Sequence, residues 1–146
     1  MLKKSEKKNF VLEDKGTITS KRALHIAEDL SYNFGEDVVV YDVKKVSPFV
    51  SYYIVASSAS ERRLRALVQT AKEALYDSYQ EIDHIEGKNG SEWVLIDCKS
   101  IVVQLFTKEQ RALVKFDELY KDVPHKIVVQ KEEPIFRRKK REAALY

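Results

Sequence analysis

Cys98 is the only cysteine in the chain, and a thiolate can act as a nucleophile or bind a metal ion. Nucleophilic catalysis needs a base beside the thiol, but the histidines lie in three separate segments, as His25, His84 and His125. The sequence contains no G-x-S-x-G motif for a serine nucleophile. With no second cysteine, neither a disulfide nor a multi-cysteine metal site can form within the chain. We therefore expect Cys98 to have no catalytic role.

Carboxylates around His84 raise the question of a metal site. Asp83 and Glu86 lie close to it in the sequence, and Asp97 belongs to a nearby predicted strand. Residues 81–86 alternate like a half-exposed strand, which would send Asp83 and His84 to opposite faces, so we expect no shared ion. We expect no metal and no cofactor.

Two further patterns could bind phosphate. The first is the turn that leads from a predicted strand into a helix, whose polar and basic residues are Ser57, Ser58, Ser60, Arg62 and Arg63. Because the four glycines lack P-loop or Rossmann spacing, helix capping with solvated arginines is the favoured interpretation. The second is a basic run, Arg137, Arg138, Lys139, Lys140 and Arg141, beside the aromatic residues Phe136 and Tyr146. It predicts weak, sequence-independent contact with RNA.

A protein-binding surface is the last candidate. In the predicted strand 92–97, Trp93, Leu95 and Asp97 share one face, while Val94 and Ile96 share the other. An exposed tryptophan is typical of an interface anchor, whereas a buried one would pack under a helix. The residues alone leave these two interpretations open.

The elements that position these residues follow from periodicity. We expect helices over 19–34, from about 58 and from 107 to 120, with caps at Thr19-Ser20, Ser58 (with Glu61) and Thr107 (with Gln110). Strands are expected at 37–43, 52–56, 81–86, 92–97 and 101–106, the last two forming a hairpin. The order predicts an α/β fold with α+β character: a single domain whose mixed sheet of about five strands is packed by helices.

Length and charge set the domain organisation of the 146 residues. Residues 1–20 hold five lysines against three acids, and 126–146 hold seven basic residues against three acids. The remaining 21–125 hold 14 basic and 17 acidic residues, which is unlike a DNA-binding domain. We therefore expect a charged N-terminal arm (1–20), a folded domain (21–125) and a basic C-terminal tail (126–146). No apolar run suits a membrane span or a signal sequence, so we expect a cytoplasmic protein and no membrane association.

Several segments, in this order, resemble the Iojap-like ribosomal silencing factor family. They are VYDV (40–43), SYYIVASSAS (51–60), RAL (65–67), EG (86–87), EWVLID (92–97), IVVQLF (101–106) and residues 111–120. The resemblance covers about residues 21–125. Three positions depart from the family pattern: Ser51 stands for an Asp, Gln104 for a His and Tyr120 for a Trp.

The resemblance implies a nucleotidyltransferase-like fold that has lost its chemistry. It further implies a translation repressor, not an enzyme, that binds a large-subunit ribosomal protein on the intersubunit face and blocks joining of the small subunit. Trp93 is the expected anchor, with Leu95, Asp97, Gln104 and Glu86 as further partner-binding residues.

Two other functions remain as alternatives. A nucleotidyltransferase-like enzyme would need Asp42, Asp83 and Asp97 to converge on a metal, although the sequence contains no D-x-D pair. An RNA-binding module would act through the basic tail. The sequence also leaves open whether the protein is a monomer or a homodimer.

Overall fold

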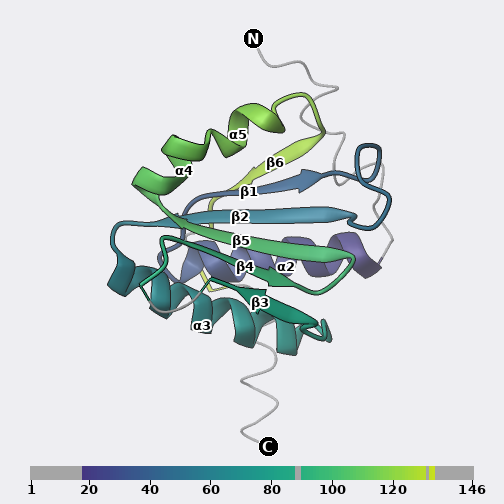
Figure 1. Cartoon of the computed structure of the whole chain (residues 1–146). Helices are drawn as coiled ribbons and strands as arrows, with labels where there is room; N and C mark the ends of the chain where they lie inside the picture. Colours follow the sequence, from purple (N-terminus) through teal and green to yellow (C-terminus); the bar gives the residue numbers. More distant parts are fainter. Residues whose placement is uncertain (1–17, 88–89, 131, 134–146) are drawn as a thin grey trace, which may run out of the picture.

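The computed structural model describes residues 18–87, 90–130 and 132–133, which form one α+β domain (Figure 1). In chain order its elements are α2 (Ile18–Tyr32), β1 (Glu36–Asp42), β2 (Tyr52–Ser58), α3 (Glu61–Asp77), β3 (His84–Glu86), β4 (Trp93–Asp97), β5 (Ile101–Thr107), α4 (Lys108–Val114), α5 (Phe116–Leu119) and β6 (His125–Val128). None of the helices in these ranges has the length and apolar character needed to span a bilayer.

The strands form a mixed six-stranded sheet in the order β3-β4-β5-β2-β1-β6. β2 and β5 run parallel, and the other neighbouring strands are antiparallel. The mixed sheet confirms the predicted fold class, but there are six strands and not about five. The additional strand is β6, which pairs with β1 and places Val128 opposite Val38. The fold thus extends past the expected boundary at residue 125, since Val128 is buried in the core. The charged residues around Val128 had made this segment look like a solvated tail.

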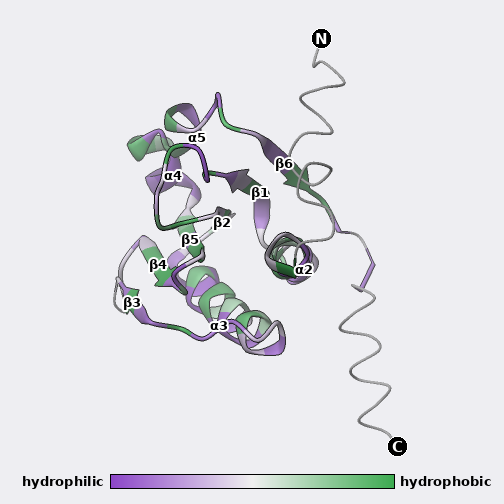
Figure 2. Cartoon of the chain, turned by 90° about the vertical axis from the view of Figure 1, so that its right-hand side faces the viewer, coloured by the Kyte–Doolittle hydropathy of each residue, from purple (hydrophilic) through white to green (hydrophobic). Residues whose placement is uncertain are grey.

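Helices α2 and α3 cover one face of the sheet (Figure 2). The helix predicted from about residue 58 is α3, and its apolar residues Leu64, Leu67, Ala71 and Leu75 are buried against the sheet. The two capping predictions at this layer are wrong. Ser60, and not Ser58, caps α3 by accepting a hydrogen bond from Arg63 N at 3.2 Å. Ser20 lies buried within α2 and does not precede it.

The opposite face of the sheet is covered only in part, by α4 and α5. The predicted cap of α4 is correct, since the Thr107 side chain accepts a hydrogen bond from Gln110 N. The helix does not continue to Tyr120 as expected, because Lys115 adopts a left-handed conformation (φ 53°) and separates α4 from α5. Phe116 and Tyr120 then pack on Tyr41 and Tyr53, over β1 and β2. None of the helices in the described residues covers the part of this face formed by β3 and β4.

Two glycines flank the β3–β4 connection, and both have a positive φ, 91° at Gly87 and 88° at Gly90. A Cβ at Gly87 would collide with the carbonyl oxygen of Trp93 and lie 3.1 Å from Cα of Val94, whereas one at Gly90 would meet nothing within 4 Å.

We expect Gly87→Ala to destabilise the protein by roughly 2 kcal/mol and Gly90→Ala by about 1 kcal/mol, the cost of the backbone conformation alone. The short, exposed edge strand β3 limits the loss, because it can detach without opening the core. Urea unfolding of both variants measures the difference. Equal losses would show that the collision at Gly87 is relieved at no cost.

Candidate functional site

The five predicted partner-binding residues lie on one face of the sheet. Trp93, Leu95 and Asp97 alternate along β4 with the buried Val94 and Ile96. In the ladders, Leu95 lies opposite both Gln104 of β5 and Glu86 of β3, and directly paired residues share a face. We call the set Glu86, Trp93, Leu95, Asp97 and Gln104 the open sheet face. It lies beside α4 and α5 and opposite α2 and α3.

The side chain of Trp93 is held in place by two contacts. Its Nε1–H donates to Oε1 of Gln104 at 3.0 Å, and its ring stacks on Phe106 with centroids 4.9 Å apart and an interplanar angle of 29°. Trp93 remains 38% exposed, whereas Gln104 is only 4% exposed. Trp93 therefore lies at the surface and not under a helix, while Gln104 orients the indole and offers little surface of its own to a partner.

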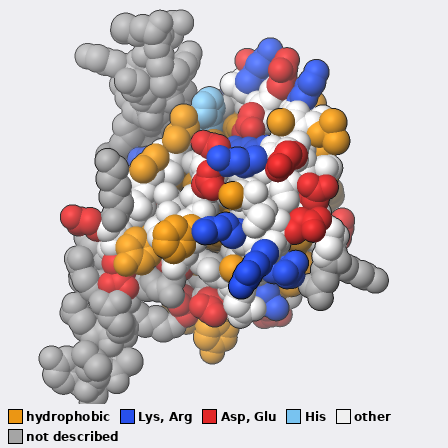
Figure 3. Space-filling view, turned by 90° about the vertical axis from the view of Figure 1, so that its left-hand side faces the viewer, with side chains coloured by type: hydrophobic (Ala, Val, Ile, Leu, Met, Phe, Trp, Pro, Cys, Tyr) orange, Lys and Arg blue, Asp and Glu red, His pale blue; other side chains and the backbone are white. Residues whose placement is uncertain are grey.

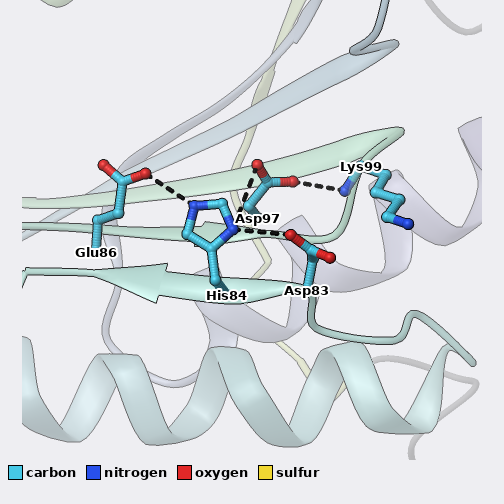
Figure 4. Close-up of polar contacts among 5 residues, drawn as sticks. All are labelled: Asp83, His84, Glu86, Asp97 and Lys99. Carbon is cyan, nitrogen blue, oxygen red and sulfur yellow. Dashed lines mark hydrogen bonds and ion pairs between the residues drawn. The ribbon is translucent and has the colours of Figure 1, made fainter.

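A charged cluster lies at the edge of the sheet, around Asp97 at the end of β4 remote from Trp93 (Figure 4). His84 Nδ1 lies 2.9 Å from Asp83 Oδ2 and 4.0 Å from Asp97 Oδ2, and its Nε2 lies 2.8 Å from Glu86 Oε2. The expected separation of Asp83 and His84 is wrong, because β3 begins only at His84 and leaves Asp83 free of strand alternation. Asp97 is fixed in turn by the backbone N–H of Lys99, which donates to Oδ1 at 2.7 Å.

The geometry of this cluster favours a protonated His84. Carboxylate oxygens only accept hydrogen bonds, and a neutral imidazole has a single N–H, so two carboxylates on the two ring nitrogens fit the imidazolium. The hydrogen bonds to Asp83 and then to Glu86 accordingly raise the pKa of His84 above its ordinary 6.5. The same bond to His84 lowers the pKa of Asp83.

We expect an NMR titration of the His84 ring to give a pKa above 6.5, and the double variant Asp83→Asn, Glu86→Gln to return it toward that value. Because the folded pKa is raised, the stabilisation by protonated His84 is complete below the unfolded pKa and is lost as the pH rises through the folded one. A pKa for His84 that does not respond to the double variant would contradict the cluster.

The other predicted chemical groups are not assembled into a site. Cys98 is buried, and burial, with Asp97 and Asp83 nearby, raises the pKa of its thiol to about 11. Asp42 binds the Lys44 ammonium on the other face of the sheet from Asp97, so the carboxylates of the transferase alternative do not converge. Within 18–87, 90–130 and 132–133, no group of three or more His, Cys, Asp or Glu side chains is placed to hold a metal ion.

The serines of the predicted phosphate turn are engaged within the protein. Ser57 Oγ accepts from Arg111 Nη1, Ser58 Oγ donates to the Ser60 carbonyl, and Ser60 Oγ caps α3. At this end of the molecule, a small group of basic side chains lies together, with acidic side chains around it (Figure 3). The second phosphate candidate, the basic run from Arg137 to Arg141, lies outside the described residues.

Arg111 is a residue that the sequence did not single out. Its guanidinium is buried and binds both carboxylate oxygens of Asp117 (2.8 and 2.9 Å), the Asp37 carbonyl oxygen (2.7 Å) and Ser57 Oγ (2.8 Å). Tyr41 OH also donates to Asp117. This network fastens α4 and α5 to β1 and β2, and so fixes the border of the open sheet face. Its members come from distant parts of the sequence, and no local motif joins them.

Comparison with known proteins identifies relatives of the whole domain. Residues 17–145 match the family described as ribosomal silencing factor during starvation. The "Ribosomal silencing factor RsfS" of Halalkalibacterium halodurans is 30% identical over 89 residues, which cover 61% of this chain and 76% of that protein. A crystal structure from Chromobacterium violaceum has a TM-score of 0.61 and 27% identity, covering 79% and 93% of the two chains. A more distant mouse relative, "Mitochondrial assembly of ribosomal large subunit protein 1", is 26% identical over 58% of this chain and 38% of its own length.

Proposed function

Because this chain belongs to the family of ribosomal silencing factors, we propose that it represses translation by binding the large ribosomal subunit and blocking its joining with the small subunit. Membership of the family makes the protein a ribosome-associated regulator of translation. The block of subunit joining is our inference, and so is the location of the protein in the cytoplasm. The name of the mouse relative associates that protein with the large subunit, which supports the choice of subunit.

The open sheet face is the surface that we assign to the ribosome. The observation that carries this assignment is Trp93, a partly exposed aromatic ring that is oriented by Gln104 and supported by Phe106. A rigid aromatic side chain loses little conformational entropy on binding, which is why such residues serve as interface anchors. Leu95 extends the apolar part of this surface beside the ring.

The charge of the open sheet face indicates a basic partner. Asp83, Glu86 and Asp97 surround His84, and Lys99 lies near Asp83, so these three carboxylates outnumber the cations even when the imidazole is charged. A positively charged surface of a ribosomal protein would complement this cluster and speed the encounter. The effect should fall as ionic strength rises, because the carboxylates are partly or fully exposed.

The mechanism that we infer is steric and requires no bond chemistry. A standard interface buries about 800 Å² on each partner, an area that a domain of this size can provide on one face. The rest of the domain would then occupy space that the small subunit needs. The carboxylate arrangement described above offers no support for the transferase alternative.

Sedimentation through a sucrose gradient tests this function. Purified protein is mixed with separated subunits in magnesium concentrations that permit association, and the fractions are analysed for the protein and for assembled ribosomes. We expect the protein to sediment with large subunits and to reduce the assembled fraction. Stoichiometric binding that leaves association unchanged would contradict the steric mechanism, and binding to small subunits alone would contradict the assigned partner.

A further inference from the structure

A groove of about 1020 Å³ lies between the first turns of α2 and the C-terminal end of α3. Its lining includes Lys21, Arg22 and His25 from α2 and Tyr76, Ser78 and Tyr79 from the end of α3. Both helices cover the face of the sheet opposite the open sheet face (Figure 2). The groove is therefore separate from the surface assigned to the ribosome.

One side of the groove is aromatic. Tyr76 and Tyr79 are 80% and 82% exposed, which is unusual for two large rings so close together in the sequence. Tyr79 has a φ of 59°, a conformation that favours glycine at the end of a helix and that costs free energy in a bulky residue. The Arg22 guanidinium lies over the Tyr79 ring, 5.7 Å from its centroid. This wall presents planar groups on which a planar ligand can stack.

The other side of the groove is positive. Lys21 and Arg22 project from the N-terminal part of α2, whose first turn contains no acidic residue. The partial positive charge of a helix N-terminus adds to theirs. Burial, and then Lys21, lower the pKa of His25, so the imidazole is neutral at pH 7. The attraction for an anion thus comes from Lys21, Arg22 and the helix.

A buried hydroxyl in the lining has no hydrogen-bond partner among the described residues. Ser78 is 5% exposed, and its Oγ makes no hydrogen bond there. Buried polar groups are nearly always paired, since an unpaired one loses its hydration without compensation. A polar ligand atom at this wall of the groove would supply the missing partner.

We propose that the groove between α2 and α3 binds a mononucleotide, with the base against the tyrosines and the phosphate beside Lys21 and Arg22. The volume suits a ligand of this size. Asp77 and Glu81 also line the groove near the aromatic wall. They can accept hydrogen bonds from ribose hydroxyls or a base amine, and they disfavour a polynucleotide, which carries a phosphate at every residue.

Titration of the isolated full-length chain with ADP tests this site, followed by amide NMR shifts and by calorimetry. We expect ADP to shift amides of α2 and the α3 end, and to bind at least tenfold more tightly than adenosine. The double variant Lys21→Gln, Arg22→Gln should weaken ADP binding at least tenfold and adenosine binding little. Arg65→Gln, which removes an exposed charge of α3 outside the groove lining, should leave both affinities unchanged.

Three results would overturn the proposal. They are the absence of ADP-induced shifts at millimolar ADP, equal affinity of the parent chain and the double variant, and tighter binding of hexaadenylate RNA than of ADP. The third would replace the mononucleotide with an RNA strand. No ribosome takes part in these measurements, so their failure is distinct from failure of the subunit-joining experiment.

Discussion

Trp93→Ala is expected to weaken binding to the large ribosomal subunit by roughly 2–4 kcal/mol, about 30-fold or more, as the loss of an anchor tryptophan does. The substitution removes the partly exposed ring of the open sheet face and leaves the buried Gln104 without its indole partner. Because the ring is only partly buried, folding should lose less than the roughly 3–5 kcal/mol that a core tryptophan contributes. Cosedimentation at several protein concentrations, together with urea unfolding, separates the two effects.

Val94 provides the matched control, since it is the next residue of β4 and its side chain is buried on the opposite face. Val94→Ala should reduce the free energy of unfolding by roughly 2 kcal/mol and leave subunit binding unchanged while the protein is folded. Trp93→Phe keeps an aromatic ring above Phe106 but loses the hydrogen bond to Gln104, so an intermediate affinity is expected. If Trp93→Ala unfolds easily but binds subunits normally when folded, the ribosome must bind elsewhere on the domain.

Arg111→Met should destabilise the folded domain by roughly 3–5 kcal/mol, the loss expected when one partner of a buried ion pair is removed. Methionine can fill the space of the aliphatic stem, so the loss reports mainly on the guanidinium. Without it, Ser57 Oγ and the Asp37 carbonyl oxygen lose their donor, and Asp117 loses both of its bonds from Arg111. Chemical unfolding followed by circular dichroism measures the change.

Lys108→Met is the control for Arg111→Met. Lys108 is an exposed lysine of the same helix that forms an ion pair with Glu36, and its removal should leave the free energy of unfolding nearly unchanged. Although burial alone would raise the pKa of Asp117, the hydrogen bonds from Arg111 and Tyr41 hold it below its usual value. This stabilisation is present above the unfolded pKa and is lost as the pH falls through the folded one. If Arg111→Met matches the control, the network does not hold α4 and α5 to the sheet.

The sequence by itself determined the elements whose apolar pattern is continuous. Strand β1, helix α3 and the β4–β5 hairpin were all predicted, because the side chains that they bury recur with the period of a helix or a strand. Alternation along β4 also placed Trp93, Leu95 and Asp97 on one face. The ordered segments from residue 40 to residue 120 were sufficient to indicate the family.

Local pattern failed where a long-range contact decides the structure. β6 is a strand because it pairs with β1, where Val128 lies opposite Val38, ninety positions earlier in the chain. The local sequence, with Pro124 and several charged residues, does not indicate this pairing. The helix after β5 breaks at Lys115, which turns Phe116 into the aromatic cluster over β1 and β2. Likewise, because β3 begins only at His84, the Asp83 carboxylate can reach the His84 ring and form a hydrogen bond with it.

The function of each site residue was decided by the tertiary structure. Sequence spacing put Trp93 and Gln104 on neighbouring strands, but only the tertiary structure shows that Trp93 is partly exposed and that the Gln104 side chain orients its indole. Arg111 would be expected in solvent on a helix surface, but it is buried because Asp117 accepts two of its hydrogen bonds and the distant Asp37 and Ser57 accept the others. A sequence gives the types of the side chains and their spacing along the chain. Which side chains are buried, and with which residues they form hydrogen bonds and ion pairs, depends on which elements the sheet brings together.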